Sequence, residues 1–299
     1  MTPDVVVAGA ASRDVDAGAR GGWRAGGGVS YGALLLARLG LRVGALVGLD
    51  ETALAAGEPA ELRAAGVEVV TAALGRGPVF ENVQTPAGRL QSCHQVSDPL
   101  PASALPAEWR TAPAFLLAPV AGEIGPEWAR VPGPNALVGL GWQGLLRGLG
   151  AGRAVRRLAP QRGHVQARAD VTALSREDVP AGEAGDAIPD LLRRTGSGLA
   201  VTAGRAGGVY LHRVASGRLE ARRWFAVPAR REVDPTGAGD VFLAALVAAR
   251  LLLGPGRGDG IGALRLAATA ASLSVEEPGL AGVPDLAAIH RRLRELSAD

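Results

Sequence analysis

Residues 5–9 read Val5-Val6-Val7-Ala8-Gly9, a run that is apolar without alternation. A strand covered on one face alternates apolar and polar residues, whereas a parallel strand covered on both faces is apolar throughout. The run therefore predicts a buried strand of a parallel sheet near the start of the chain.

Similar short apolar runs, bounded by Gly, Pro or charged residues, recur at residues 42–48, 67–71, 114–118, 136–140 and 198–202. Helix-like stretches lie between these runs, at residues 30–39, 51–65 and 186–194, and further helices are expected at 238–253, 259–275 and 284–297. Strand alternating with helix is typical of a three-layer α/β/α fold with a mostly parallel central sheet. No linker or internal repeat divides the chain, so we expect a single domain over residues 1–299.

Two segments break the alternation of strand and helix. Residues 12–27 are rich in Gly and Arg, and residues 77–97 hold two short extended pieces around a Pro86-Ala87-Gly88 turn. Such pieces around a turn are typical of a hairpin, so we expect these segments to form a small β lid over one end of the sheet. The exposed edge of the lid is a candidate for pairing two copies in a homodimer.

The composition excludes several classes of protein. The 32 basic residues nearly balance the 29 acidic ones, which argues against a nucleic-acid partner. The single cysteine, Cys93, allows no internal disulfide and no thiolate metal cage. The chain begins without the basic segment of a signal peptide, and no apolar run reaches the roughly 20 residues of a membrane span. We therefore expect a soluble cytoplasmic protein without a membrane partner.

The most informative stretch is residues 231–242, REVDPTGAGDVF, where a loop rich in small residues runs into an apolar helix. Unpaired backbone N–H groups and the positive end of the helix dipole make such a helix start an anion site. Asp240 lies in the first turn and is placed to accept a proton from an attacking hydroxyl. An anion site beside a base is what phosphoryl transfer requires, although the same pattern also suits an Asx-Pro turn with a helix-capping Asp.

The segment from Asp234 to Phe242 resembles the second signature of the ribokinase-like (PfkB) carbohydrate kinase family. The resemblance implies an ATP-dependent kinase that works with Mg²⁺ and has the ribokinase-like fold. It also implies that Asp240 is the catalytic base. The amides of Gly237, Ala238 and Gly239 would then hold the transferring phosphoryl group.

Part of the N-terminal region resembles the family's paired-glycine motif, which lies under the bound acceptor. It comprises Gly26, Gly27 and Gly28, followed by Tyr31. A flexible loop ahead of a helix accounts for the same residues. Tyr31 stands where sugar kinases carry an Asn, so it departs from the pattern, and an aromatic ring there could stack on a sugar face or a nucleoside base.

Asp14 follows the first strand and matches the acidic residue with which the family binds substrate hydroxyls, with Asp16 as the second candidate. Either could equally be a solvated loop residue. Gln143 begins a Gln-Gly-x-x-Arg segment that resembles one in sugar and cyclitol kinases, so it is a further acceptor-binding candidate. The surrounding Gly139-x-Gly141-x-x-Gly144 pattern is too weak, and too far from a first strand, to predict a dinucleotide site.

The resemblance also reaches the donor side. Residues 202–208 resemble the family's Thr-x-Gly-x-x-Gly segment at the nucleotide phosphates, which makes Thr202, Gly204, Arg205 and Gly207 candidate nucleotide-binding residues. A plain hairpin turn explains the same residues. Ala268 lies in a helix that resembles the one beside adenine, where small residues also serve close helix packing.

Asp178 stands where many members of the family have the Glu that organises magnesium. With Ser175 it also fits a helix capping box, so the two roles are left open.

We therefore predict a kinase that phosphorylates a hydroxyl of a small sugar or cyclitol, with a polyol, sugar or nucleoside as its small-molecule partner. The alternatives are a nucleoside kinase and a kinase-fold protein that binds ligand without turnover.

Overall fold

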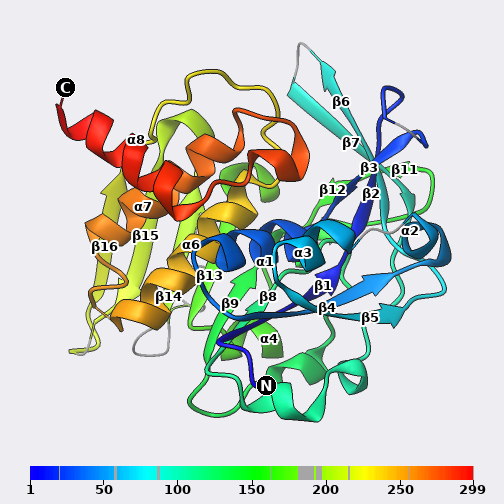
Figure 1. Cartoon of the computed structure of the whole chain (residues 1–299), viewed down its shortest axis with the longest axis horizontal. Coiled ribbons are helices and arrows are strands. Elements are labelled where there is room, and N and C mark those ends of the chain that lie inside the picture. The colour runs from blue at the N-terminus through cyan, green and yellow to red at the C-terminus, as the bar shows by residue number, and fades with distance from the viewer. Residues whose placement is uncertain are drawn as a thin grey trace.

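The computed structural model describes the chain except residues 20, 57–58, 86–87, 162, 181–191, 193–196, 215, 255 and 299. Its centre is a nine-stranded sheet in the order β16-β15-β14-β13-β9-β8-β1-β4-β5 (Figure 1). The strands are β1 (Val5–Ala10), β4 (Val43–Leu49), β5 (Glu68–Ala73), β8 (Ala114–Leu117), β9 (Leu137–Gly141), β13 (Val171–Ser175), β14 (Gly198–Thr202), β15 (Gly208–Arg213) and β16 (Leu219–Trp224).

Seven of these strands, from β14 to β5, pair in parallel, and β15 pairs antiparallel with both β14 and β16. The prediction of an α/β fold with a mostly parallel sheet is confirmed. Residues 171–175 were not foreseen as a strand, because the apolar run there is short and lies beside polar residues that resemble a binding segment.

Helices pack against one face of the sheet around the central helix α6 (Ala238–Leu253), whose residues from Val241 to Arg250 are all buried. Helices α1 (Gly28–Arg38) and α7 (Ile261–Ser274) pack beside it, and α8 (Leu286–Ala298) packs against α7. Side chains of these helices and of one face of β1, β4 and β8 form one core cluster. The apolar surface all round α6 was predicted, and burial holds its N-terminus rigidly in place.

The opposite face of the sheet carries a second core cluster under short helical pieces: η1 (Ala102–Ala104), η2 (Ala107–Thr111), η3 (Pro126–Arg130) and α4 (His164–Arg168). The two clusters on the two faces make the three layers. The single helix expected over 51–65 is wrong: α2 (Glu51–Ala55) and α3 (Ala60–Ala64) are separate, and Pro59 stands at the N-cap of α3. The helix expected at 186–194 falls almost entirely outside the described residues.

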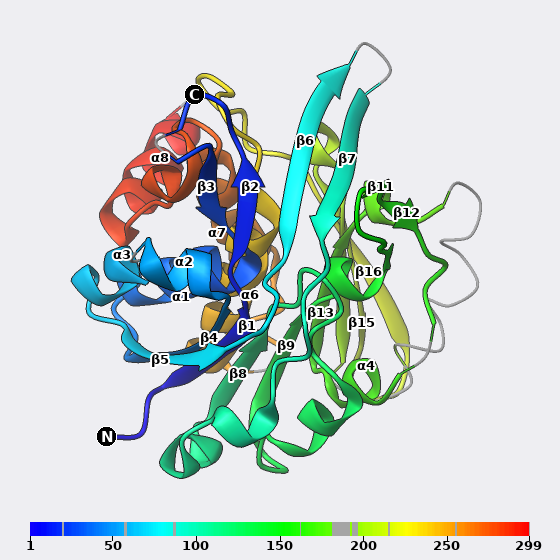
Figure 2. The same ribbon diagram turned by 90° about the vertical axis from the view of Figure 1, so that its right-hand side faces the viewer.

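A smaller sheet has the strand order β11-β7-β6-β2-β3 and projects beyond the central sheet, as Figure 2 shows for β6 and β7. Its strands are β2 (Ser12–Val15), β3 (Trp23–Gly26), β6 (Val79–Thr85), β7 (Gly88–Gln95) and β11 (Arg153–Ala154), and a separate ribbon pairs β10 (Arg147–Gly148) with β12 (Arg156–Arg157). The segments expected to form the lid thus lie in one sheet, and movement of this small sheet as a lid stays a prediction. The expected turn tip at Pro86 and Ala87 lies outside the described residues.

Among the helices that the structure describes, none is both long enough and apolar enough to cross a bilayer.

Candidate active site

A cleft of about 1030 Å³ opens where the parallel strands end, between the central sheet and the small sheet. Crevices at the carboxyl ends of parallel strands are the usual ligand sites of open α/β sheets. Of the candidate site residues from the sequence, all but the second acidic candidate, Asp16, and the first glycine of the paired-glycine motif, Gly26, line this one cleft: Asp14, Gly27, Gly28, Tyr31, Gln143, Asp178, Thr202, Gly204, Arg205, Gly207, Gly237, Ala238, Gly239, Asp240 and Ala268. Residues as far apart in the chain as Asp14 and Ala268 are therefore brought together.

The floor of the cleft is the start of α6, with Gly237 as its N-cap at φ 79°. This left-handed conformation favours glycine, and the ring of Tyr31 packs so closely against Gly237 that no Cβ would fit. The helix provides no internal acceptors for its first N–H groups. Of the amides predicted to hold phosphate, the Ala238 N–H donates to the Pro235 carbonyl at 3.4 Å, whereas the N–H groups of Gly239 and of Asp240, which was not among the predicted amides, lie in the first turn of α6. The loop from Asp234 to Asp240, called the anion loop below, is therefore suited to bind phosphate oxygens.

Asp240 lies half-buried in the first turn of α6, and its carboxylate touches the start of α1. A Cβ added at Gly28 would lie 2.5 Å from Asp240 Oδ1, so only glycine allows this approach. Burial raises the pKa of Asp240 from 3.8 to about 6. The negative charge of Asp178 adds to this rise, and the positive charge of Arg147 opposes it. A carboxylate with a pKa near neutrality is suited to general-base work.

Tyr31 is only 2% exposed and lies beneath the anion loop. Burial, followed by the negative charges of Asp234, Asp14 and Asp240, raises the pKa of Tyr31 above its usual range, so the phenol stays neutral. The ring therefore supports Gly237, and little of it is available to stack on a ligand as the sequence suggested.

The small sheet and the loops beside it line one end of the cleft. Asp14 lies there and accepts a hydrogen bond from Ser12 Oγ at 3.3 Å. Asp16 does not line the cleft and instead forms an ion pair with Arg24 at 2.7 Å. Of the two acidic residues, Asp14 is thus the one placed to meet an acceptor hydroxyl.

The hairpin of β14 and β15 lines the opposite end of the cleft, as expected for residues 202–208, together with α7. Arg205 is 88% exposed on its side chain and pairs with Glu232 at 2.8 Å, so it belongs to the rim. Ala268, with Ala271 and Val275, gives α7 an apolar surface toward the cleft.

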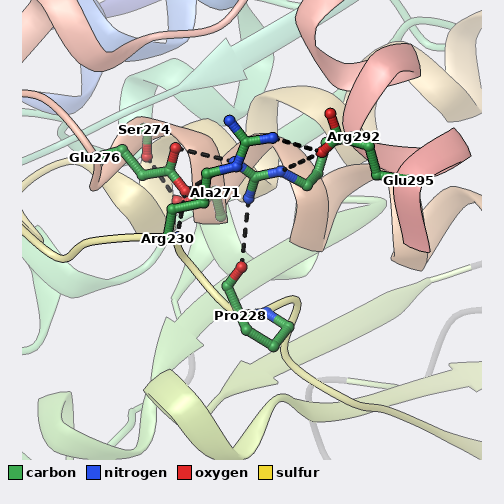
Figure 3. A network of polar contacts seen from close by, with 7 residues as sticks. All are labelled: Pro228, Arg230, Ala271, Ser274, Glu276, Arg292 and Glu295. Carbon is green, nitrogen blue, oxygen red and sulfur yellow. Dashed lines mark hydrogen bonds and ion pairs between the residues drawn. The ribbon is translucent and has the colours of Figure 1, made fainter. Parts of the chain in front are cut away.

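A network of hydrogen bonds and ion pairs fixes the segment of residues 228–230, which lines the cleft near the end of α7 (Figure 3). Arg292 is buried, binds Glu276 at 2.9 Å and donates to the Pro228 carbonyl at 3.3 Å. Arg230 donates its backbone N–H to Glu276 at 2.6 Å and pairs with Glu295 at 2.8 Å. Helix α8 thereby holds this wall of the cleft in place.

Asp178 makes the capping-box contacts that the sequence suggested. Its Oδ2 accepts from the Ser175 N–H at 2.7 Å, and its Oδ1 accepts from Gln143 Nε2 at 2.8 Å. No group of three or more potential metal ligands exists among the residues that the structure describes.

Arg147 in the cleft and Glu123 behind it were not singled out from the sequence. Arg147 lines the cleft, donates to the Val120 carbonyl at 2.9 Å and lies 5.1 Å over the Phe80 ring. Glu123 is 1% exposed and accepts from the Ala10 N–H at 2.9 Å, which fixes the loop that follows β1. The Gln-Gly-x-x-Arg pattern contains Arg147, whereas nothing in the pattern around Glu123 marks it.

Comparison with known proteins agrees with this geometry. The family model described as pfkB family carbohydrate kinase matches residues 168–286, which include the anion loop and α7. No curated protein sequence matches the chain.

Solved structures share the fold over nearly the whole chain. Ribokinase of Arabidopsis thaliana, complexed with ribose and ATP, is 20% identical, with a TM-score of 0.70 over 98% of this chain and 99% of that one. The nucleoside kinase of Methanocaldococcus jannaschii is 16% identical, with a TM-score of 0.71 over 98% of both chains. A pyrophosphate-dependent myo-inositol-1 kinase, converted by mutation into a myo-inositol-3 kinase, is 19% identical, with a TM-score of 0.70 over 96% of this chain and 98% of that one.

The fold, the anion loop and the family match together define a phosphotransferase with an alcohol group as acceptor. Residues 168–286 thus match the pfkB family of carbohydrate kinases, and the whole chain shares its fold with solved kinases of the ribokinase family.

The raised pKa of Asp240 predicts that Asp240→Asn stabilises the free protein at alkaline pH. The folded state binds the proton of this carboxyl more tightly than the unfolded chain does. The contribution of Asp240 to the free energy of unfolding therefore falls as the pH rises from 3.8 to about 6. We expect the variant to be more stable than the wild type by about 1–3 kcal/mol at about pH 8, and by much less at about pH 4.

Urea unfolding at the two pH values measures this difference. Asp98→Asn is the control, because Asp98 lies outside the cleft and its pKa is lowered by the hydrogen bond from Arg76. Equal stability of Asp240→Asn and the wild type at both pH values would contradict a raised pKa of the half-buried Asp240.

Proposed function

We propose that this chain transfers the terminal phosphoryl group of ATP, with Mg²⁺, to a hydroxyl of a small sugar or cyclitol. The observation that carries the proposal is Asp240 at the N-terminus of α6, where a base with a pKa of about 6 adjoins unpaired amides. The two parts meet the separate needs of phosphoryl transfer, a base for the attacking hydroxyl and fixed donors for the charged oxygens.

In this proposal the acceptor lies between Asp14 and Asp240. Asp14 accepts hydrogen bonds from acceptor hydroxyls, and Asn82 and Gln91 of the small sheet line the same end of the cleft. Asp240 takes the proton of the attacking hydroxyl as its oxygen bonds to the γ-phosphorus of ATP, and the bond from that phosphorus to the bridging oxygen breaks to release ADP. The amides of Gly239 and Asp240 then stabilise the charge on the equatorial oxygens.

A polyol fits the acceptor end better than a nucleoside does. Polar side chains predominate there, and the one ring expected to stack on a base, Tyr31, is buried under Gly237. This favours the sugar or cyclitol over the alternative acceptor. Binding without turnover is disfavoured because a mere binding site has no need of a buried carboxylate with a raised pKa.

ATP as the donor is supported by the apolar end of the cleft. Ala268 and Ala271 of α7, its C-cap Val275, and Val227 and Pro228 all line the cleft, and such an apolar surface suits the planar adenine base. Because a solved relative is named as pyrophosphate-dependent, pyrophosphate is the second candidate donor. Pyrophosphate has no group that would occupy the apolar end.

The residues present fit a magnesium ion carried by the donor. Magnesium commonly binds through one or two carboxylates, with phosphate oxygens and waters completing its shell. Glu177 and Asp178, which follow β13, are carboxylates that line the cleft. Both oxygens of Asp178 already accept hydrogen bonds. Asp178 would therefore hold the ion through water, and the bound ion would neutralise phosphate charge.

We expect ADP release from Mg·ATP to be stimulated by one or more members of a panel of sugars, inositols and nucleosides. With that acceptor, Asp240→Asn should lower kcat by about 10²–10⁴-fold, because a positioned base is lost. For the wild type, kcat/KM should rise with pH through the pKa of about 6.

Asp98→Asn serves as the control and should keep full activity. No stimulation by any acceptor with either donor, ATP or pyrophosphate, would refute the kinase proposal. Undiminished turnover by Asp240→Asn would show that the base lies elsewhere.

Filling the apolar end of the cleft separates the two donors. Ala271→Phe should raise the KM for ATP about tenfold or more, because the added ring occupies the space proposed for the adenine of ATP. Ala287→Phe, at an exposed position of α8, is the matched control. Thermal unfolding checks that both variants fold, and an unchanged KM for ATP in folded Ala271→Phe would remove the argument for a nucleotide donor.

A further inference from the structure

Arg24 links the small sheet to the anion loop. It lies on β3, and its Nη1 pairs with Asp234 Oδ2 at 3.1 Å while its Nε pairs with Asp16 Oδ2 at 2.7 Å. The Asp234 side chain is 11% exposed and that of Arg24 is 42% exposed. The two residues lie 210 positions apart, so their ion pair is a tertiary contact between two structural units.

The acceptor-binding candidate Asp14 is the direct neighbour of Arg24 across the strands. In the antiparallel pair of β2 and β3, Asp14 stands opposite Arg24. Side chains of directly opposed residues project from the same face of a sheet. A ligand that fixes Asp14 therefore also restricts the strand pair that carries Arg24.

On the other side of the contact, Asp234 shapes the anion loop. Its carboxylate accepts the Thr236 N–H at 2.9 Å and the Gly279 N–H at 3.1 Å. Burial alone would raise the pKa of Asp234, but the hydrogen bonds from Thr236 and Gly279, together with the charge of Arg24, hold the pKa below its usual value. The carboxylate is thus charged near neutral pH and needs a cation beside it.

We propose that Arg24 is a positioning residue that couples occupancy of the acceptor site to the geometry of the anion loop. The inference rests on the proposed function for its catalytic consequence. Acceptor bound at Asp14 orders β2 and β3, Arg24 then holds Asp234 in place, and Asp234 sets the turn that leads to Gly237 and the first amides of α6. Arg24 touches no reacting atom in this scheme.

The coupling gives Arg24 a kinetic signature different from that of a residue that only binds acceptor. The amides of the anion loop act on charge that develops in the transition state, so their misplacement lowers kcat. Contacts between the acceptor and Asp14 are left in place, so the acceptor KM should change little.

The first test is kinetic, in Arg24→Gln, Arg24→Lys and the control Arg42→Gln. Arg42 pairs with Asp4 on the surface and does not line the cleft. With an acceptor found in the panel, Arg24→Gln should lower kcat about tenfold or more while acceptor KM changes less than about threefold. Arg24→Lys keeps the charge and should recover part of the loss, and Arg42→Gln should match the wild type.

The double variant Arg24→Gln/Asp234→Asn tests whether the two residues act together, by comparing its kcat with that of each single variant. If Arg24 acts through Asp234, the double variant should be little worse than Asp234→Asn alone. Full additivity of the two losses, or a kcat unchanged in Arg24→Gln, would overturn the inference.

The second test needs no substrate. Hydrogen exchange of the amides in residues 234–241 should be about tenfold faster in Arg24→Gln than in the wild type, and unchanged in Arg42→Gln. Unchanged exchange in Arg24→Gln would overturn the coupling even for an active enzyme. If exchange is faster in Arg24→Gln but the wild type phosphorylates no acceptor, the result would support the link between Arg24 and the anion loop. The same result would refute the proposed function.

Discussion

The N–H groups in the first turn of α6 find no acceptor within the helix, and the fold leaves them at the floor of a cleft. Much of the surrounding structure keeps this turn in place. The buried body of α6 holds the helix against the sheet, the ring of Tyr31 supports Gly237, and Asp234 ties the loop to the turn after α7. An anion site held this rigidly can stabilise charge without reorganising at the moment of reaction.

The same rigidity places Asp240 in a costly environment. Its carboxylate lies against the start of α1, where position 28 must be glycine, and burial raises its pKa to about 6. A protein selected for stability alone would have little reason to keep an acid there. The cost is understandable if the carboxylate must be partly desolvated to accept a proton, which is the use that the chemistry of a kinase provides.

Continuous apolar runs such as residues 5–9 predicted the parallel sheet, and the anion loop predicted the cleft, because both depend on local pattern. Other features depend on tertiary contacts. The burial of Tyr31 follows from its packing on Gly237, the link from Arg24 to Asp234 spans 210 positions, and Glu123 meets Ala10 from 113 positions away. The separation of α2 from α3 was readable from Pro59, but the helical periodicity around it obscured that signal.

The most direct test of the account is a crystal structure with magnesium, a non-hydrolysable ATP analogue and an acceptor. We expect a γ-phosphate oxygen within about 3 Å of the Gly239 or Asp240 nitrogen, and an Asp240 carboxylate oxygen within about 3 Å of an acceptor hydroxyl. We also expect the adenine to lie against Ala271 on α7. A γ-phosphate bound away from the first turn of α6, or an acceptor out of reach of Asp240, would contradict the proposed function.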